Sequence, residues 1–355
     1  MKIKEQTLVI LTPGFPKDEQ DSTCLPLQQN LLMEIKKQYP RLNIIVLSFQ
    51  YPFVKKTYTW NGITVIAFNG QNKGGLPKLL IRYKVNTALQ KIHKTTTINA
   101  VLSFWYGECA WLGKRFAAKS RVKHYCWLLG QDAKRNNKYP QKTNLQGNEL
   151  LALSDFLQNE FERNYNIRPL HVVPPGINDE EYETIIPQKH IDILAAGSLI
   201  TLKQYEIFIA VVAAVKKQQP NIKAVLIGDG PEKNKLQALI AMQGLEQNIK
   251  LAGALSHQQT LQQMQQAKIF LHPSSYEGFG MVNIEALYAG CQVISFCKPM
   301  LQDIAQWHIV SSQEGMFTKL MELLQDEHLK IEIICPFTIE DTAKKMMTIM
   351  GLNPQ

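Results

Sequence analysis

The chain has 355 residues, of which 45% are hydrophobic and 19% charged, and its formal net charge is +9. This length favours two domains over one, and the composition excludes a disordered or fibrous chain. No apolar run approaches the roughly 18 residues that a membrane-spanning helix needs.

Short apolar segments alternate with amphipathic ones in the first half, which predicts a parallel sheet covered on both faces. The first apolar segment follows the N-terminus directly and lacks a small-residue cleavage site, so we expect a β-strand and no signal peptide. The expected strands are Thr7–Leu11, Ile44–Phe49, Thr64–Phe68, Ala100–Phe104, Tyr125–Leu129, Leu150–Leu153 and His171–Val173, and the expected helices are Cys24–Gln38, Lys78–Lys94, Trp111–Ala118 and Phe156–Tyr165.

Two prolines, a glycine and an acidic run between Pro174 and Tyr182 predict a connection between domains, and Pro187 follows them. The alternation of strands and helices then begins again. The expected strands are Ile191–Ala196, Lys223–Ile227, Ile249–Leu251, Ile269–Leu271 and Gln292–Phe296, and the expected helices are Gln204–Gln218, Pro231–Met242, His257–Ala267, a short helix after Gly280, and Thr338–Met350.

Basic residues are concentrated in the first half. Residues 1–187 contain 25 Lys and Arg against 15 Asp and Glu, a net charge of +10, whereas residues 188–355 contain 14 against 15, a net charge of −1. This asymmetry favours contact with an anionic surface such as lipid headgroups, the alternative being ordinary solvated lysines. The expected helix Lys78–Lys94 is basic and amphipathic. Such a helix either lies on a membrane surface or packs on the core with its basic face in solvent.

Six scattered cysteines show no zinc-ligand spacing, so we expect reduced thiols, no metal site and a cytoplasmic location. No aromatic–basic motif accompanies the positive charge, so we expect no nucleic-acid partner.

The segment from His272 to Gly290 is the most informative part of the chain. It predicts a buried strand, an acidic loop, a Gly-Phe-Gly turn and a short helix, with Glu277 and Glu285 separated by seven residues. Such a turn presents backbone N–H groups at a helix N-terminus, where anions bind. A ligand with a phosphate group between hydroxyl-rich ends, such as a sugar nucleotide, suits this pattern.

Pro273–Gly280, the spacing of the two glutamates and Glu285–Gly290 together resemble the donor-site signature of retaining glycosyltransferases of family four (glycosyltransferase group 1). The resemblance implies an α/β protein of the GT-B fold, with two Rossmann-like parallel-sheet domains facing a cleft. It implies an acceptor-binding domain over residues 1–187 and a donor-binding domain over 188–335. Residues 336–355 are then a C-terminal helix that returns to the first domain.

The resemblance also implies roles for single residues. Lys203 would hold the donor diphosphate beside Ser198, which stands where the family has an arginine. Glu285 would bind the ribose, and Glu277 would lie near the transferred sugar, so Glu277 and Lys203 are the expected catalytic pair. The remaining expected donor-side positions are Gly197, Gly228, Gly253, Gly278, Phe279, Gly280 and Met281, and those on the acceptor side are Gly14, Glu108, Gly130 and Asp132, with Leu129 in place of a family histidine.

The implied activity is that of a hexosyltransferase in cell-surface polysaccharide synthesis. The donor would be a UDP- or GDP-sugar, and the acceptor a hydroxyl of a glycan or of a lipid-linked molecule, with no metal or other cofactor. The enzyme would contact the inner face of an anionic membrane peripherally. Two alternatives stay open: a sugar-nucleotide epimerase on the same fold, and a catalytically silent partner subunit, which Ser198 and Leu129 favour.

Overall fold

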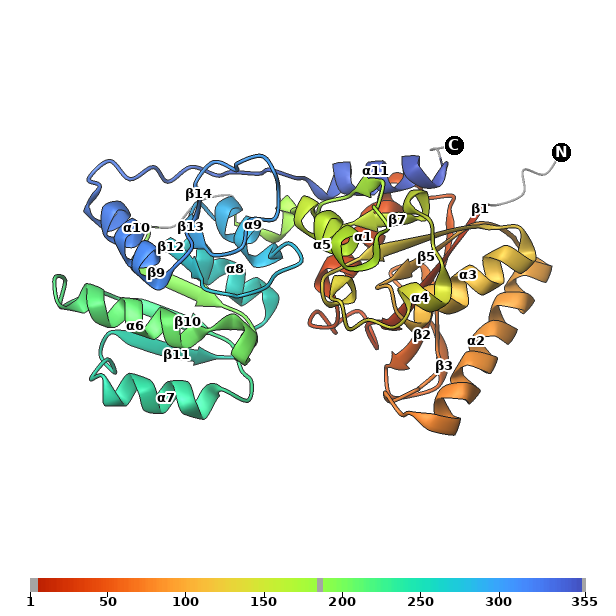
Figure 1. Cartoon of the computed structure of the whole chain (residues 1–355), viewed down its shortest axis with the longest axis horizontal. Coiled ribbons are helices and arrows are strands. Elements are labelled where there is room, and N and C mark those ends of the chain that lie inside the picture. The colour runs from red at the N-terminus through yellow and green to blue at the C-terminus, as the bar shows by residue number, and fades with distance from the viewer. Residues whose placement is uncertain (1–5, 184–187, 353–355) are drawn as a thin grey trace. The chain divides into compact units, whose positions relative to one another are not determined.

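The computed structural model describes residues 6–183 and 188–352 and divides the chain into two compact units (Figure 1). The first unit comprises residues 1–176 and 339–355, and the second comprises residues 177–338. The boundary expected at residue 187 lies outside the described residues. Tyr182 packs its ring on Tyr288, with centroids 4.5 Å apart, which explains why the division falls earlier, between Gly176 and Ile177.

The first unit is built on an eight-stranded sheet in the order β3-β4-β2-β1-β5-β6-β7-β8. Its strands pair in parallel except for the edge strand β3, which runs antiparallel to β4 and was not among the expected elements. The strands are β1 (Gln6–Gly14), β2 (Asn43–Tyr51), β3 (Lys56–Trp60), β4 (Ile63–Ala67), β5 (Thr97–Phe104), β6 (Lys123–Leu128), β7 (Leu150–Ala152) and β8 (His171–Val172). The helices are α1 (Pro26–Gln38), α2 (Gly75–Thr95), α3 (Glu108–Ser120), α4 (Pro140–Thr143), α5 (Asp155–Tyr165) and α11 (Ile339–Met350).

The C-terminal helix α11 packs on the first unit, although the 162 residues of the second unit (177–338) separate it in the sequence from the main segment of the first. It buries an apolar face that includes Ile339, Met346 and Met350. Gln38 donates a hydrogen bond to the Glu340 carbonyl at 3.1 Å, and the Tyr125 hydroxyl donates one to the Ile349 carbonyl at 3.0 Å. The residues just before α11 belong to the second unit instead, because the Ile177 N–H bonds to the Phe337 carbonyl at 2.9 Å.

The second unit has a six-stranded parallel sheet in the order β11-β10-β9-β12-β13-β14. Counted along the chain this is the order 3-2-1-4-5-6 of a dinucleotide-binding Rossmann fold. The strands are β9 (Ile191–Ala196), β10 (Ala224–Ile227), β11 (Ile249–Gly253), β12 (Ala267–His272), β13 (Gln292–Ser295) and β14 (Trp307–Ile309), and the helices are α6 (Tyr205–Lys216), α7 (Lys233–Met242), α8 (His257–Gln265), α9 (Met281–Tyr288) and α10 (Gln313–Gln325).

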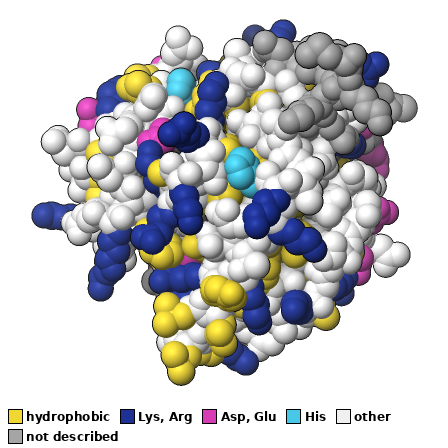
Figure 2. Space-filling view, turned by 90° about the vertical axis from the view of Figure 1, so that its right-hand side faces the viewer, with side chains coloured by type: hydrophobic (Ala, Val, Ile, Leu, Met, Phe, Trp, Pro, Cys, Tyr) yellow, Lys and Arg dark blue, Asp and Glu magenta, His cyan; other side chains and the backbone are white. Residues whose placement is uncertain are grey.

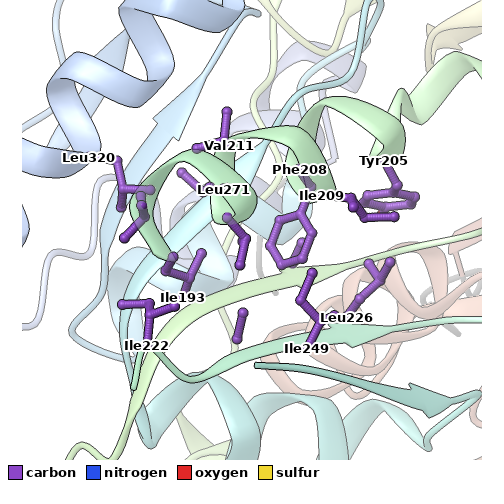
Figure 3. Close-up of a cluster of buried hydrophobic side chains, with 14 of the residues drawn as sticks. Ile193, Tyr205, Phe208, Ile209, Val211, Ile222, Leu226, Ile249, Leu271 and Leu320 are labelled. Atoms are coloured by element: carbon purple, nitrogen blue, oxygen red, sulfur yellow. The ribbon is translucent and has the colours of Figure 1, made fainter. Parts of the chain in front are cut away.

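An apolar core holds one face of this sheet against α6, α7 and α10 (Figure 3). Phe208 and Ile209 of α6 lie over Ile193 and Leu226 of the sheet, and Leu320 of α10 closes the far end. These side chains are almost fully buried, as expected for strands covered on both faces. The core fixes the ends of β9 and β12, and therefore the loops that follow them.

None of the helices in the described part of the chain combines the length and the apolar character that crossing a bilayer requires.

Candidate functional site

The loops after β9 and β12 meet at the point where the strand order of the second sheet reverses. In open α/β sheets ligands bind outside the carboxyl ends of the strands at this switch point. Gly197 and Lys203 follow β9, while His272 ends β12 and Glu277 follows it. The structure therefore brings together the two residues that the sequence analysis expected to be catalytic.

Lys203, Glu277 and His272 form a connected charged cluster. The Lys203 ammonium forms an ion pair with Glu277 Oε1, and His272 Nε2 lies 2.9 Å from the same oxygen. The side chains of Lys203 and Glu277 are 17% and 15% exposed, so solvent screens the pair only in part. Burial alone would raise the pKa of Glu277, but the hydrogen bond from His272 and the charge of Lys203 lower it to about 2.

His272 acts as a neutral donor to this carboxylate. It is 1% exposed, and burial lowers its pKa below the ordinary value. An ionised carboxylate can only accept hydrogen bonds, so Nε2 carries the proton and Nδ1 carries the lone pair. His272 belongs to the motif string of the sequence analysis but was not expected at the site. Its role depends on the turn that folds Glu277 back onto the strand end.

Several buried polar groups around Glu277 have no hydrogen-bond partner among residues 6–183 and 188–352. They are the Tyr205 hydroxyl, His272 Nδ1 and both amide atoms of Asn283. The Tyr205 hydroxyl lies beside Gly197, because a Cβ added to Gly197 would come within 2.7 Å of that oxygen. The Asn283 amide lies beside Gly280, because a Cβ added to Gly280 would come within 2.6 Å of Asn283 Nδ2. Because buried polar groups are normally satisfied, this concentration indicates a place for polar ligand atoms or water.

Glycines bring the backbone of the two neighbouring loops into contact. Gly228 follows β10 with a φ of +147°, and its N–H bonds to the Gly253 carbonyl at 2.9 Å. A Cβ at Gly228 would lie 1.9 Å from the Gly197 carbonyl oxygen. The expected donor-side glycines Gly197, Gly228 and Gly253 therefore form one packed layer at the ends of adjacent strands.

A Gly228→Ala variant is expected to lose about 2–3 kcal/mol of unfolding free energy, because both the backbone conformation and the close carbonyl exclude a side chain. Urea denaturation of the purified chain measures this. Gly244→Ala is the matched control: its φ is +63°, but nothing lies within 4 Å of the added Cβ. Its loss should stay near 1 kcal/mol, and equal losses in both variants would contradict the packing argument.

The start of α9 carries the remaining expected donor-side positions. Gly280 has a φ of +84° and precedes the helix, and no side chain caps its first turn. Phe279 is 1% exposed and packs its ring on Trp307 and Phe337, so this residue can reach a ligand only through its backbone. Met281 begins the helix, and Gly278 is buried. An uncapped helix start favours negative charge.

Glu285 lies one helical turn further on and has a partner that the sequence analysis missed. His257 Nε2 is 2.9 Å from Glu285 Oε1, and its Nδ1 is 3.8 Å from a carboxylate oxygen of Glu181. Burial lowers the pKa of His257, but the hydrogen bond to Glu285 and the charges of both glutamates outweigh this effect and raise it. Glu285 is 12% exposed and stays within reach of solvent and ligands.

The stability that His257 contributes should depend on pH. Its pKa is raised above 6.5, so the contribution is complete below about pH 6.5 and is lost as the pH rises through the folded-state value. Replacing His257 with Gln should cost about 1 kcal/mol near pH 6 and much less near pH 9. Thermal or urea unfolding at both pH values tests this, and a cost that is the same at both would refute it.

Ser198 is exposed on the loop after β9, and its carbonyl accepts a hydrogen bond from the Ile200 N–H at 2.9 Å. Its short hydroxyl cannot supply the positive charge of the arginine that the family resemblance leads one to expect there. Lys203 is therefore the cation that this loop contributes to the site.

The expected acceptor-side residues lie in the first unit, at the ends of its strands. Asp132 is 7% exposed, and its carboxylate accepts hydrogen bonds from the N–H groups of Tyr106, Leu129 and Gly130 at 2.8–3.2 Å. These contacts hold the turn after β6. Gly14 ends β1.

Glu108 begins α3 and is not a free carboxylate. Its Oε1 lies 2.5 Å from Arg82 Nε, and its Oε2 lies 4.0 Å from Lys78 Nζ. Arg82 and Lys78 come from α2, some 26 and 30 residues earlier (108 minus 82, and 108 minus 78). Local sequence patterns could not reveal this pairing.

Among residues 6–183 and 188–352, no group of three or more His, Cys, Asp or Glu side chains is arranged to hold a metal ion.

The second unit, which carries the site, resembles a known protein family. Residues 177–330 match the family model of glycosyl transferases group 1. A gpi3 subunit of phosphatidylinositol N-acetylglucosaminyltransferase from Schizosaccharomyces pombe is 29% identical over 133 residues, which cover 37% of this chain but only 29% of that protein. An uncharacterized glycosyltransferase from Methanocaldococcus jannaschii is 22% identical over 72% of this chain and 73% of its own length.

The fold of the whole chain is that of GT-B glycosyltransferases. The structure of Anabaena HepE in complex with UDP and glucose superposes with a TM-score of 0.69 and 16% identity, over 98% of this chain and 99% of that one. Both Rossmann-like units are therefore elements of a known architecture.

Proposed function

We propose that the chain is a glycosyltransferase whose donor is a nucleotide-diphosphate sugar, because residues 177–330 match the family model of glycosyl transferases group 1. It transfers a hexose-type sugar with retention of configuration to a hydroxyl of a glycan or lipid-linked acceptor. Its biological role is in the synthesis of cell-surface polysaccharide.

The Lys203–Glu277–His272 cluster at the switch point carries this proposal. Lys203 and the uncapped start of α9 supply positive charge for the donor diphosphate, and no metal ion or other cofactor takes part. In the reaction the bond between the anomeric carbon and the diphosphate oxygen breaks, and its electron pair leaves with the nucleotide. The acceptor hydroxyl oxygen bonds to the anomeric carbon, and its proton passes to the departing diphosphate. The cations stabilise the charge that develops on that oxygen.

Glu277 accepts hydrogen bonds from the transferred sugar through the part of its carboxylate that Lys203 and His272 leave open. Glu285 accepts hydrogen bonds from the ribose hydroxyls, and His257 orients it. The proposal also explains the unpaired groups near Glu277, because sugar hydroxyls would satisfy Tyr205, His272 Nδ1 and Asn283. The acceptor binds to the first unit, whose basic charge favours peripheral contact with an anionic membrane, and the scattered cysteines favour a cytoplasmic location.

Calorimetric titration with UDP and GDP, followed by release of UDP or GDP from a panel of sugar nucleotides, tests the function. We expect one nucleotide to bind, and Glu285→Ala to weaken its binding about 10- to 100-fold, since a buried ribose would lose charged hydrogen bonds. Lys250→Ala, an exposed position on β11, is the control.

The outcomes separate the alternatives. Product formed from the donor alone would identify an epimerase. Nucleotide binding without turnover in the presence of candidate acceptors would identify a silent subunit, and no nucleotide binding at all would refute the proposal.

A further inference from the structure

The first unit contains a basic cavity that none of the expected site residues lines. It has a volume of about 440 Å³ and is bounded by α2, α3 and the segment around α4. The side chains around it are Lys78, Arg82, Trp111, Lys138, Tyr139 and Lys142. It combines four cations with two aromatic rings, which is the lining of a site for an anion.

The positive charge of this cavity is only partly neutralised. Glu108 pairs with Arg82 and lies 4.0 Å from Lys78, which leaves four cations against one carboxylate. In the described part of the chain, Lys138 and Lys142 have no carboxylate partner, and both are exposed. The cavity therefore has a surplus of positive charge at its open side, where a phosphate group would be attracted.

Contacts among the lining side chains hold the cavity in shape. The Arg82 guanidinium lies 4.7 Å from the centre of the Trp111 ring, and its Nη2 is 3.4 Å from the Tyr139 hydroxyl. Stacking and hydrogen bonding hold the Arg82 side chain in one conformation, so little conformational entropy would be lost when an anion binds.

An exposed apolar stripe runs along the same helix, α2. Leu76, Leu79, Leu80 and Tyr83 are 76%, 55%, 56% and 70% exposed, and their spacing of i, i+3, i+4 and i+7 places them on one face. The opposite face, with Ile81, Val85, Leu89 and Ile92, is buried in the core. The helix therefore does not need the stripe for its own packing.

Lys78 and Arg82 of the cavity alternate along α2 with the residues of the stripe, so the two features adjoin. Figure 2 shows hydrophobic side chains gathered at the lower edge of one face of the molecule, with Lys and Arg side chains around them. An apolar stripe bordered by cations matches the two layers of an anionic bilayer surface, where phosphate groups lie outside the acyl chains.

We propose that the α2 stripe and the adjoining cavity form a docking site for an anionic phospholipid membrane, in which the cavity holds a lipid phosphate and the stripe enters the acyl-chain region. This inference rests on the proposed peripheral contact with an anionic membrane and gives it a defined location. It does not depend on the activity of the second unit.

Co-sedimentation of the full chain with vesicles tests the proposal. We expect binding to phosphatidylcholine vesicles that contain phosphatidylglycerol and little binding to phosphatidylcholine alone. Lys138→Ser/Lys142→Ser should weaken binding about 30-fold, since each lysine near such a surface contributes about 1 kcal/mol. Leu79→Ser/Leu80→Ser should reduce binding to the level of neutral vesicles.

Lys344→Ser/Lys345→Ser is the matched control, because it removes the same charge from exposed positions of α11 in the same unit. It should weaken binding much less than the cavity variant does. Equal losses in the two lysine pairs would mean a diffuse charge effect and would overturn the proposal, as would unchanged binding of the stripe variant.

Two other occupants give distinct results. If glycerol 3-phosphate binds the cavity while vesicles do not, the site takes a soluble anion and the membrane proposal fails. If the free chain dimerises, and Leu79→Ser/Leu80→Ser abolishes the dimer but leaves vesicle binding unchanged, the stripe is the contact with a second copy of the chain and the membrane proposal fails. Calorimetry with nucleotide on the same variants reports the second unit separately, so failure of donor binding is distinguishable from failure of docking.

Discussion

A Lys203→Met variant is expected to lose sugar transfer about 10²- to 10³-fold in kcat, the usual cost of removing one group that stabilises developing negative charge. The charge on the departing diphosphate is greater in the transition state than in the bound donor. The loss should therefore appear mainly in kcat, and the affinity for the nucleotide should fall by a smaller factor. Steady-state kinetics and calorimetry on the same protein give the two numbers.

Two further variants decide how the Lys203 result is read. Lys203→Arg keeps the positive charge, so we expect it to recover part of the lost kcat. Lys319→Met removes a half-buried lysine that pairs with Glu322 at 2.6 Å on α10, and it should leave turnover unchanged. Full activity of Lys203→Met would remove the lysine from the proposed mechanism.

Much of the second unit follows from local sequence patterns. Apolar strands that end in glycine turns, followed by amphipathic helices, predict parallel strands whose carboxyl ends meet, and this placed Lys203 and Glu277 on neighbouring loops. The bonds of Glu285 to His257 and of Glu108 to Arg82 were not predictable in this way. They join residues 28 and 26 positions apart through packing that only the assembled fold defines.

The missed elements have a similar cause. The first four residues of β3 alternate between partial and full exposure along an edge, and Trp60 at its end is buried, so no apolar run marks the strand. The helix α10 contains Gly315 in its first turn, which weakens its intrinsic propensity. Met316 and Leu320, which pack into the core of the second unit, stabilise it instead.

A Glu277→Gln variant should be affected in both activity and stability. The amide keeps the size of the side chain but carries no charge, so the ammonium of Lys203 would remain partly buried without its counterion, and the proposed hydrogen bonds to the sugar would weaken. We expect a loss in kcat of about 10²-fold or more. Removing one member of a partly buried ion pair should also lower the free energy of unfolding by about 2–3 kcal/mol near neutral pH.

The pH dependence of that stability loss identifies its origin. The folded-state pKa of Glu277 is depressed from 4.5 to about 2, so its carboxylate contributes stability that is complete above about pH 4.5 and is lost as the pH falls towards 2. The difference in unfolding free energy between the wild type and Glu277→Gln should therefore shrink between about pH 7 and pH 3 in urea denaturation. Glu322→Gln, which breaks the pair of this exposed glutamate with Lys319, should stay within about 0.5 kcal/mol of the wild type at both pH values. A difference that is large but independent of pH would mean that Gln disturbs packing at the site, and the charge of Glu277 would then have no part in holding Lys203.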